Sequence, residues 1–123
     1  MGKEQGFRDL EAWKAAKALR RKVSIFSREF PKFEQYQLTQ QLTNSSRSVS
    51  ANIAEGYGRY HYKETTKHCR IARGSLDETL DHLIEARDEN YITEAQLDEV
   101  TTLHERCRKL LNGYINYVEK LAG

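Results

Sequence analysis

Proline and cysteine are scarce in this chain of 123 residues, and long apolar segments are absent. Pro31 is the only proline, so it alone can interrupt a helix by removing a backbone donor. Hydrophobic residues make up 38% of the chain and charged residues 31%, and no apolar run is long enough to cross a bilayer. The first residues, MGKEQGFRDLE, lack the apolar core of a secretory signal. This composition predicts a soluble, cytoplasmic, mostly helical domain with no membrane contact.

Motifs for catalysis and metal binding are also missing. The two cysteines, Cys69 and Cys107, stand apart on apolar helical positions, so we interpret both as small core residues. No nucleophile–base pair, phosphate-binding loop or dinucleotide fingerprint is present. We therefore expect no metal, no cofactor and no enzymatic activity. The four histidines are scattered and are predicted to lie on the surface: His61, His68, His82 and His104.

What the chain does contain is four long amphipathic segments. Apolar residues recur every three or four positions, which predicts helices over about residues 8–29, 34–55, 63–89 and 93–121. Pro31 separates the first two, and we interpret Gly56 as the left-handed residue that ends the second. Thr93 and Gln96 have the spacing of a capping box at the start of the fourth. Short connections make consecutive helices antiparallel neighbours. The prediction is an all-α, antiparallel up-down-up-down four-helix bundle forming a single domain over residues 1–123.

The same periodicity predicts the core face of each helix. These faces comprise Ala12, Ala16, Leu19, Val23, Phe26 and Phe30; Leu38, Leu42, Ser45, Val49 and Ile53; Cys69, Ala72, Leu76, Leu80, Leu83 and Ile84; and Leu97, Val100, Leu103 or His104, Cys107, Leu111, Tyr114, Val118 and Leu121. Gly74 stands in the middle of the third predicted helix, where glycine costs about 1 kcal/mol relative to alanine. We expect close approach of the second and third helices to offset that cost.

Charge is strongly segregated along the sequence. Residues 77–105 are net −9, whereas residues 1–32 are net +5 and residues 58–76 net +4. In an antiparallel bundle, the acidic block lies at one end and most of the cations at the other, which predicts polarity along the axis. The third predicted helix begins with cations and ends with acids, opposite to the preference of the helix dipole. That placement favours an anionic partner or contact between subunits.

Two groups of cations are candidates for phosphate contacts. Those of the first predicted helix share one face, which suits phosphate tracking but is equally typical of a solvated surface. Residues 57–63 interleave aromatic and basic side chains, which can hold single-stranded nucleic acid. The tyrosines could instead close the bundle or fill a subunit interface. The predicted nucleic-acid-binding residues are Lys14, Lys17, Arg21, Arg59, Lys63, Lys67 and Arg70.

Four stretches occur in the order and spacing of a known family: FRDLEAWKAAKAL, FPKFEQYQLTQQL, SVSANIAEGYGR and IARGSLDETLDHL. By these motifs the chain resembles the four-helix-bundle proteins encoded in intervening sequences of bacterial 23S rRNA genes. Ser50 stands where many relatives have proline. The resemblance implies a homopentameric ring without assigned catalytic activity. It also implies kinship with the accessory variability determinants of diversity-generating retroelements, which bind nucleic acid and a reverse transcriptase. The positions carried over as a structural signature include Asn52, Glu55, Gly56, Gly74 and Ser75.

Two functions stay open at this point. The first is a non-enzymatic, homo-oligomeric, pentameric accessory protein that binds RNA or single-stranded DNA through basic surfaces. The second is a protein-interaction scaffold, such as the accessory subunit of a reverse transcriptase. An enzyme that uses Asn52, Glu55 and Arg59 has the least support from the sequence. We interpret Asn52 and Glu55 as residues that tie the second helix to a neighbouring helix or subunit, with Arg59 in reach of Glu55.

Overall fold

The computed structural model describes residues 6–59 and 61–123 of the chain. Its four long helices are α1 (Glu11–Ser27), α2 (Leu38–Tyr57), α3 (Tyr62–Asp88) and α4 (Glu94–Ala122). Two short 3₁₀ helices, η1 (Gly6–Asp9) and η2 (Lys32–Glu34), precede α1 and α2. No strand occurs in the two described ranges. The predicted all-α class is therefore confirmed.

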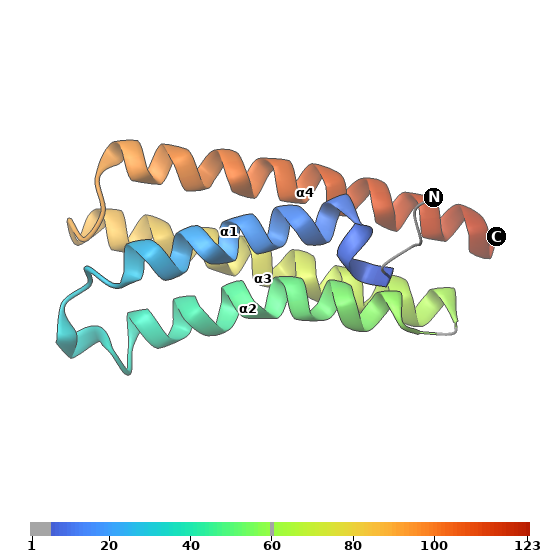
Figure 1. Ribbon diagram of the computed structural model, residues 1–123, viewed down its shortest axis with the longest axis horizontal. Coiled ribbons are helices and arrows are strands. Elements are labelled where there is room, and N and C mark those ends of the chain that lie inside the picture. The colour runs from blue at the N-terminus through green and yellow to red at the C-terminus, as the bar shows by residue number, and fades with distance from the viewer. Residues whose placement is uncertain (1–5, 60) are drawn as a thin grey trace.

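The helices form a bundle in which each one packs against its neighbours in sequence. α1 contacts α2, α2 contacts α3, α3 contacts α4, and α4 closes the ring against α1. In Figure 1, successive helices run in opposite directions, with the α1–α2 and α3–α4 connections at one end and the α2–α3 connection at the other. Within the described chain, α1 and α3 stand on a diagonal, and no Cα atom of one lies within 8 Å of a Cα atom of the other.

The first two helices begin later than the periodicity predicts. Residues 6–9 form η1 instead of the first turn of α1. α2 begins at Leu38 rather than near Glu34, because residues 32–34 form η2 and Gln37 has a non-helical backbone, with φ −125° and ψ −108°. The Glu34 side chain is buried. Its carboxylate accepts hydrogen bonds from the Leu38 N–H at 3.3 Å and from the Tyr91 hydroxyl at 2.8 Å. Glu34 thus caps α2 and ties η2 to the α3–α4 connection.

The turn from α3 into α4 contains one helix end that the sequence pattern did not predict and one helix start that it did. Asn90 adopts φ 64°, while the Tyr91 N–H donates to the Ala86 carbonyl oxygen at 2.9 Å. A left-handed Asn with this hydrogen bond is a Schellman-type helix end. Thr93 Oγ1 then accepts from the Gln96 N–H at 3.1 Å, and Gln96 Oε1 accepts from the Thr93 N–H at 2.8 Å. The predicted capping box is confirmed.

The core contains most of the residues predicted to face inward. Every predicted position of the first two helices is buried, as are most of those of the last two. Cys69 and Cys107 are free, fully buried thiols, as predicted. Burial raises the pKa of Cys69 to about 11 and that of Cys107 to about 12, so neither is a reactive thiolate near neutral pH.

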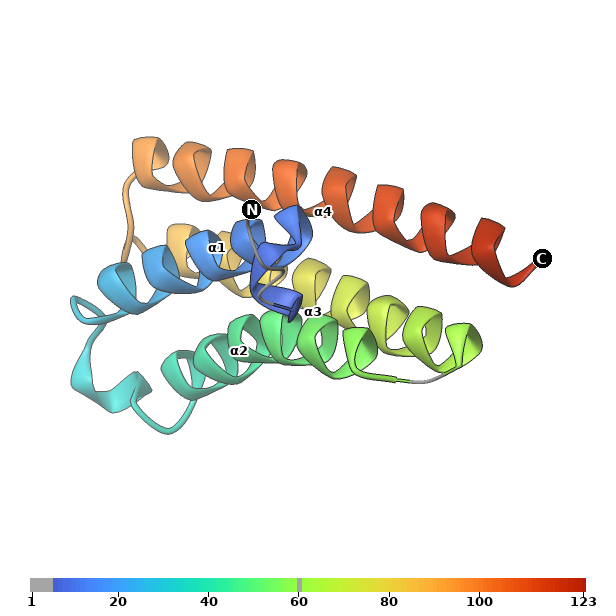
Figure 2. The same cartoon turned by 45° about the vertical axis from the view of Figure 1, so that its right-hand side comes forward.

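Some predicted positions are wrong. Ile84 is 43% exposed, because one residue of helical rotation carries it outward from the buried Leu83. Leu121 is 49% exposed, and Figure 2 shows the last turns of α4 extending beyond the start of α1. Leu80 is only half-buried. His104 was predicted to lie on the surface with the other histidines, but it is only 7% exposed. The core position that the sequence assigned to either Leu103 or His104 is therefore occupied by His104.

Candidate nucleic-acid interface

All seven predicted nucleic-acid-binding residues are exposed, but they form two separate groups. The α1 stripe comprises Lys14, Lys17 and Arg21. The α3 corner, at the α2–α3 connection and the first turns of α3, comprises Arg59, Lys63, Lys67 and Arg70. Because α1 and α3 stand on the diagonal of the bundle, the structure does not join the two groups into one surface.

The α1 stripe is partly held by contacts within its own helix. Lys14 Nζ lies 3.0 Å from Glu11 Oε2, and Lys17 Nζ lies 5.6 Å from the centre of the Trp13 ring. Arg21 makes no ion pair within the described residues and lines a surface hollow of about 130 Å³. The stripe therefore offers one uncompensated cation and two that already have partners.

Two lysines at the start of α3 lack such partners. Lys63 and Lys67 are exposed, stand four residues apart and make no ion pair within the described part of the chain. Like charges at this spacing repel each other by a few tenths of a kcal/mol. Lys63, in the first turn of α3, also lies at the positive end of the helix dipole, where a cation is unfavourable. The positive charge at the start of α3 is thus not compensated by any ion pair within the described part of the chain.

The other two cations of the α3 corner are paired. Arg59 forms an ion pair with Glu55, as predicted, and Arg70 forms one with Glu119 of α4. Both pairs are solvent-exposed, so each contributes little to stability and leaves its guanidinium accessible. Tyr60, which belongs to the predicted aromatic and basic loop, lies outside the described residues.

A hollow of about 470 Å³ adjoins the α3 corner, between the first turns of α3 and the last turns of α4. Its lining residues are Tyr62, Lys63, Thr66, Arg70, Glu119 and Ala122. The Tyr62 ring is exposed, so it can stack on a flat partner. Here the ring lies beside the unpaired Lys63 and the paired Arg70, and aromatic rings beside cations occur in sites for single-stranded nucleic acid.

The charge pattern is less axial than the sequence predicts. The acidic block, residues 77–105, lies around the α3–α4 connection. Cations of α1 nevertheless continue to that same end, and Lys22 Nζ lies 2.6 Å from Glu99 Oε2 of α4. Part of the acidic charge is therefore neutralised within the subunit.

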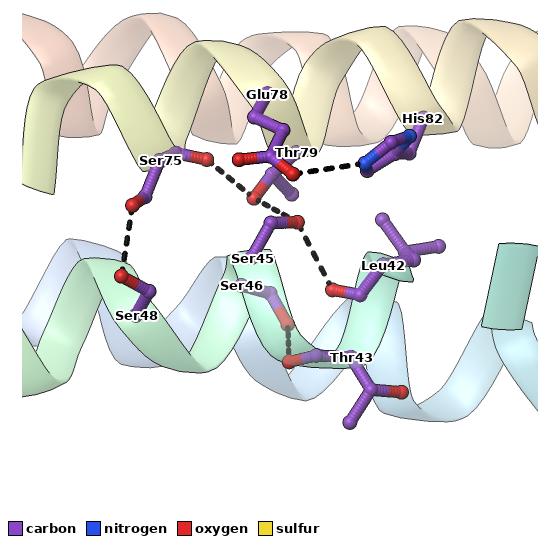
Figure 3. Close-up of polar contacts among 9 residues, drawn as sticks. All are labelled: Leu42, Thr43, Ser45, Ser46, Ser48, Ser75, Glu78, Thr79 and His82. Atoms are coloured by element: carbon purple, nitrogen blue, oxygen red, sulfur yellow. Dashed lines mark hydrogen bonds and ion pairs between the residues drawn. The ribbon is translucent and has the colours of Figure 1, made fainter. Parts of the chain in front are cut away.

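A seam of hydroxyl groups joins α2 to α3 (Figure 3). Ser48 Oγ and Ser75 Oγ lie 2.8 Å apart, and the Thr79 hydroxyl donates to Ser45 Oγ at 2.9 Å. Thr79 Oγ1 also lies 2.8 Å from the Ser75 carbonyl oxygen. These small side chains let the two backbones approach while their buried polar atoms remain hydrogen-bonded. Signature residue Ser75 is therefore part of the helix–helix contact.

Asn52 extends this seam as predicted. Its Nδ2 donates to the Ser48 carbonyl oxygen at 2.9 Å, and its Oδ1 lies 3.2 Å from His68 Nδ1 of α3. Asn52 thus links α2 to α3. Glu55 instead pairs with Arg59, four residues later, so it fixes the end of its own helix.

The two signature glycines differ from the prediction. Gly56 lies inside α2, which continues to Tyr57, and the helix ends at Gly58 with φ −79°. A Cβ on Gly56 would lie 3.0 Å from the Thr65 carbonyl oxygen and 3.1 Å from His68 Cβ. A Cβ on Gly74 would meet nothing within 4 Å. Close approach of α2 and α3 therefore requires glycine at 56, and not at 74.

A polar cluster that sequence reasoning missed joins α3 to α4. His104 Nε2 lies 2.9 Å from Asp77 Oδ1, and Arg108 Nη1 lies 2.7 Å from both carboxylate oxygens of Asp77. Burial raises the pKa of Asp77, but the hydrogen bonds from Arg108 and His104 outweigh it and hold that pKa below its usual value. Only the packing register of the two helices could have revealed these partners, because they lie 27 and 31 residues apart.

We expect Asp77→Asn to reduce the acid sensitivity of folding. A carboxyl group whose pKa is lowered by folding contributes stability above its unfolded pKa and loses it as the pH falls through the folded value. The wild type should therefore lose free energy of unfolding below about pH 4 that the variant does not. Because the Asp77 side chain is 53% exposed, the difference should stay below about 1 kcal/mol.

Urea unfolding between about pH 7 and pH 3 measures this difference. Asp81→Asn is the control, since Asp81 is exposed on the same helix and makes no ion pair in the described chain. An Asp77→Asn variant with the acid dependence of the wild type would contradict the role assigned to the cluster.

Within residues 6–59 and 61–123, no three His, Cys, Asp or Glu side chains are grouped so as to hold a metal ion. None of the helices in those ranges combines the length and the apolar character needed to cross a bilayer.

Comparison with known proteins gives one family match and a shared fold. The profile of the family described as "23S rRNA-intervening sequence protein" matches residues 8–113. A crystal structure of a protein with unknown function from the S23 ribosomal protein family of Bacteroides thetaiotaomicron is similar, with a TM-score of 0.76 and 21% sequence identity. The alignment covers 85% of this chain and 97% of that one. Comparison with curated proteins gives no match.

Proposed function

Because this chain belongs to the 23S rRNA-intervening sequence protein family, we propose that it is a non-enzymatic, homo-oligomeric accessory protein that binds RNA or single-stranded DNA. The observation that carries the proposal is the pair Lys63 and Lys67, exposed and without an ion pair in the described chain, beside the exposed Tyr62 ring. An anionic strand offsets both the repulsion between the two lysines and the unfavourable place of Lys63 in the first turn of α3.

The strand binds by phosphate contacts and stacking rather than by reading base edges. Lys63 and Lys67 contact successive phosphates, while a base stacks on Tyr62 at the mouth of the hollow. Arg70, oriented by Glu119, supplies a further donor on the same rim. Contacts of this kind give weak sequence preference and a steep dependence on salt.

Self-association should raise the affinity for the strand. A closed ring, pentameric by resemblance to the family, repeats the α3 corner once per subunit. A strand that contacts several copies gains affinity without any new kind of contact. Exposed apolar side chains available for such contacts include Phe33, Tyr36, Ile71, Tyr117 and Leu121.

We expect the double charge reversal Lys63→Glu with Lys67→Glu to weaken RNA binding at least about tenfold at low salt. Two lost phosphate contacts should also reduce the slope of log K against log salt by about 1.4. Fluorescence anisotropy with a labelled single-stranded RNA of about 20 nucleotides, titrated at several salt concentrations, measures both quantities.

The matched control is Lys32→Glu with Lys109→Glu, which changes the net charge equally at exposed positions outside both cation groups. Lys17→Glu with Arg21→Glu tests the α1 stripe separately. Equal binding by the α3-corner variant and the control would contradict the proposal, as would a stable monomer in light scattering whose mass RNA does not change. A protein partner recovered after nuclease treatment, without RNA binding, would favour the scaffold alternative.

A further inference from the structure

A small polar cleft between α1 and α2 plays no part in the function proposed above. Its volume is about 80 Å³, room for a group the size of two or three water molecules at ~30 Å³ each. The lining residues are Arg20, Val23, Ser24, Ser27, Thr43, Ser46 and Arg47. The lining thus combines two cations with four hydroxyl groups and includes no acidic side chain. We call it the two-arginine cleft.

Arg20 is held in a fixed position at this cleft. Its Nη1 donates to Ser50 Oγ of α2 at 2.7 Å, and Ser50 Oγ donates in turn to the Arg47 carbonyl oxygen at 3.3 Å. Arg20 is half-buried, whereas Arg47 is exposed. One hydrogen bond leaves Arg20 with four further N–H donors. The guanidinium is therefore oriented before any ligand arrives, which lowers the entropy lost on binding.

Neither arginine of the cleft pairs with a carboxylate in the described part of the chain, whereas some arginines of this bundle do. Arg59, Arg70 and Arg108 each pair with a carboxylate. Within the described residues, Arg20 and Arg47 make no ion pair. Two cations lining one partly enclosed cleft repel each other more strongly than they would in open solvent. A bound anion removes that repulsion.

The hydroxyl groups complete the set of donors. Ser27 and Ser46 already donate to carbonyl oxygens of their own helices, at 3.4 and 3.1 Å. Ser24 on α1 and Thr43 on α2 make no side-chain hydrogen bond within the described chain. One free hydroxyl and one arginine thus line the cleft from each helix. Forked guanidinium donors combined with hydroxyl groups match the oxygens of a phosphate.

We propose that the two-arginine cleft binds a phosphate group, with Arg20 and Ser24 contributed by α1 and Arg47 and Thr43 by α2. The inference goes beyond the proposed function, because these residues lie outside both the α1 stripe and the α3 corner. The shared chemistry is the phosphate itself, supplied either as the free ion or by a nucleic-acid strand. The cleft is too small to hold a base, so it does not select a sequence.

Nuclear magnetic resonance of the full chain tests the proposal with inorganic phosphate, which replaces chloride at constant ionic strength. Amide signals of residues 20–27 and 43–47 should shift and saturate. Arg47→Gln should weaken this binding at least about tenfold, since a charge-assisted contact is lost. Arg20→Lys keeps the charge but loses the fork, so it should also weaken binding. The control Arg106→Gln, an exposed arginine on α4, should leave it unchanged.

Short single-stranded RNA with and without a 5′-phosphate identifies the source of the phosphate. Stronger cleft shifts with the 5′-phosphorylated strand indicate a terminal phosphate, and equal shifts indicate internal phosphodiesters. Cleft shifts with inorganic phosphate alone indicate the free ion. Shifts that do not saturate, or that are the same in Arg47→Gln and Arg106→Gln, would overturn the proposal. The Lys63→Glu, Lys67→Glu variant should keep its phosphate binding, so failure of RNA binding at the α3 corner is a separate result.

Discussion

Gly56→Val should lower the free energy of unfolding by about 3 kcal/mol, near the upper end for an added side chain in a packed interior. The first added carbon would already lie 3.0 Å from the Thr65 carbonyl oxygen and 3.1 Å from His68 Cβ. The nearer of these atoms belongs to the backbone of α3, so relief requires a shift of the whole helix. A β-branched side chain inside a helix adds a further cost. Urea unfolding followed by circular dichroism measures the loss.

Gly74→Ala is the matched control for this substitution. Gly74 is exposed inside α3, and an added Cβ meets nothing within 4 Å. The alanine should therefore stabilise the helix by up to about 1 kcal/mol. If Gly56→Val unfolds at the same urea concentration as the wild type, the close approach of α2 and α3 described at Gly56 is contradicted. If Gly74→Ala is destabilising instead, a contact between subunits uses the glycine.

The same substitution connects packing to the proposed function. Thr65, the residue nearest to Gly56, lies between Lys63 and Lys67 on the first turns of α3. A shift of that segment changes where both lysines stand relative to Tyr62. Gly56→Val should thus weaken RNA binding at temperatures where the variant remains folded, while Gly74→Ala should not. This result would assign Gly56 an indirect role in the proposed RNA binding, through the position of the α3 corner.

The glycines also show what periodicity can and cannot predict. The apolar pattern located all four helices and most of their buried faces, because burial repeats with the helical turn. A glycine near the end of an apolar stripe is typical of a helix stop. At Gly56 a side chain is instead excluded by the nearby atoms of Thr65 and His68, which belong to another helix. No pattern within α2 contains that information.

The candidate interface likewise has features that the sequence predicts and features that depend on the packing of the helices. All seven predicted cations are exposed, as charged side chains usually are, and those of α1 were predicted to lie opposite its apolar face. Their separation into two groups depends on the order of helices around the bundle, which puts α1 and α3 on a diagonal. The pairing of Arg70 with Glu119 joins residues 49 positions apart. Arg20 and Arg47 were missed because, in sequence, each is an ordinary cation on a polar helix face.

Leu83→Ala and Ile84→Ala, adjacent substitutions in α3, should differ by at least about 2 kcal/mol in their effect on stability. The sequence pattern places both side chains in the core, whereas in the structure Leu83 is fully buried and Ile84 is 43% exposed. Leu83→Ala leaves a cavity among packed residues and should cost about 3 kcal/mol. Ile84→Ala removes exposed surface and replaces a β-branched residue by the best helix former, so it should cost less than about 0.5 kcal/mol.

Urea unfolding at two protein concentrations separates the possible causes of any other result. Equal losses for the two variants at both concentrations would show that Ile84 packs inside the bundle as Leu83 does, which would contradict the exposure of Ile84 described here. A loss for Ile84→Ala that grows on dilution would instead mean that its exposed face is covered by another subunit, since the stability of an assembled protein depends on its concentration. The loss of stability caused by Leu83→Ala should not depend on protein concentration, because the contacts of Leu83 lie within one bundle.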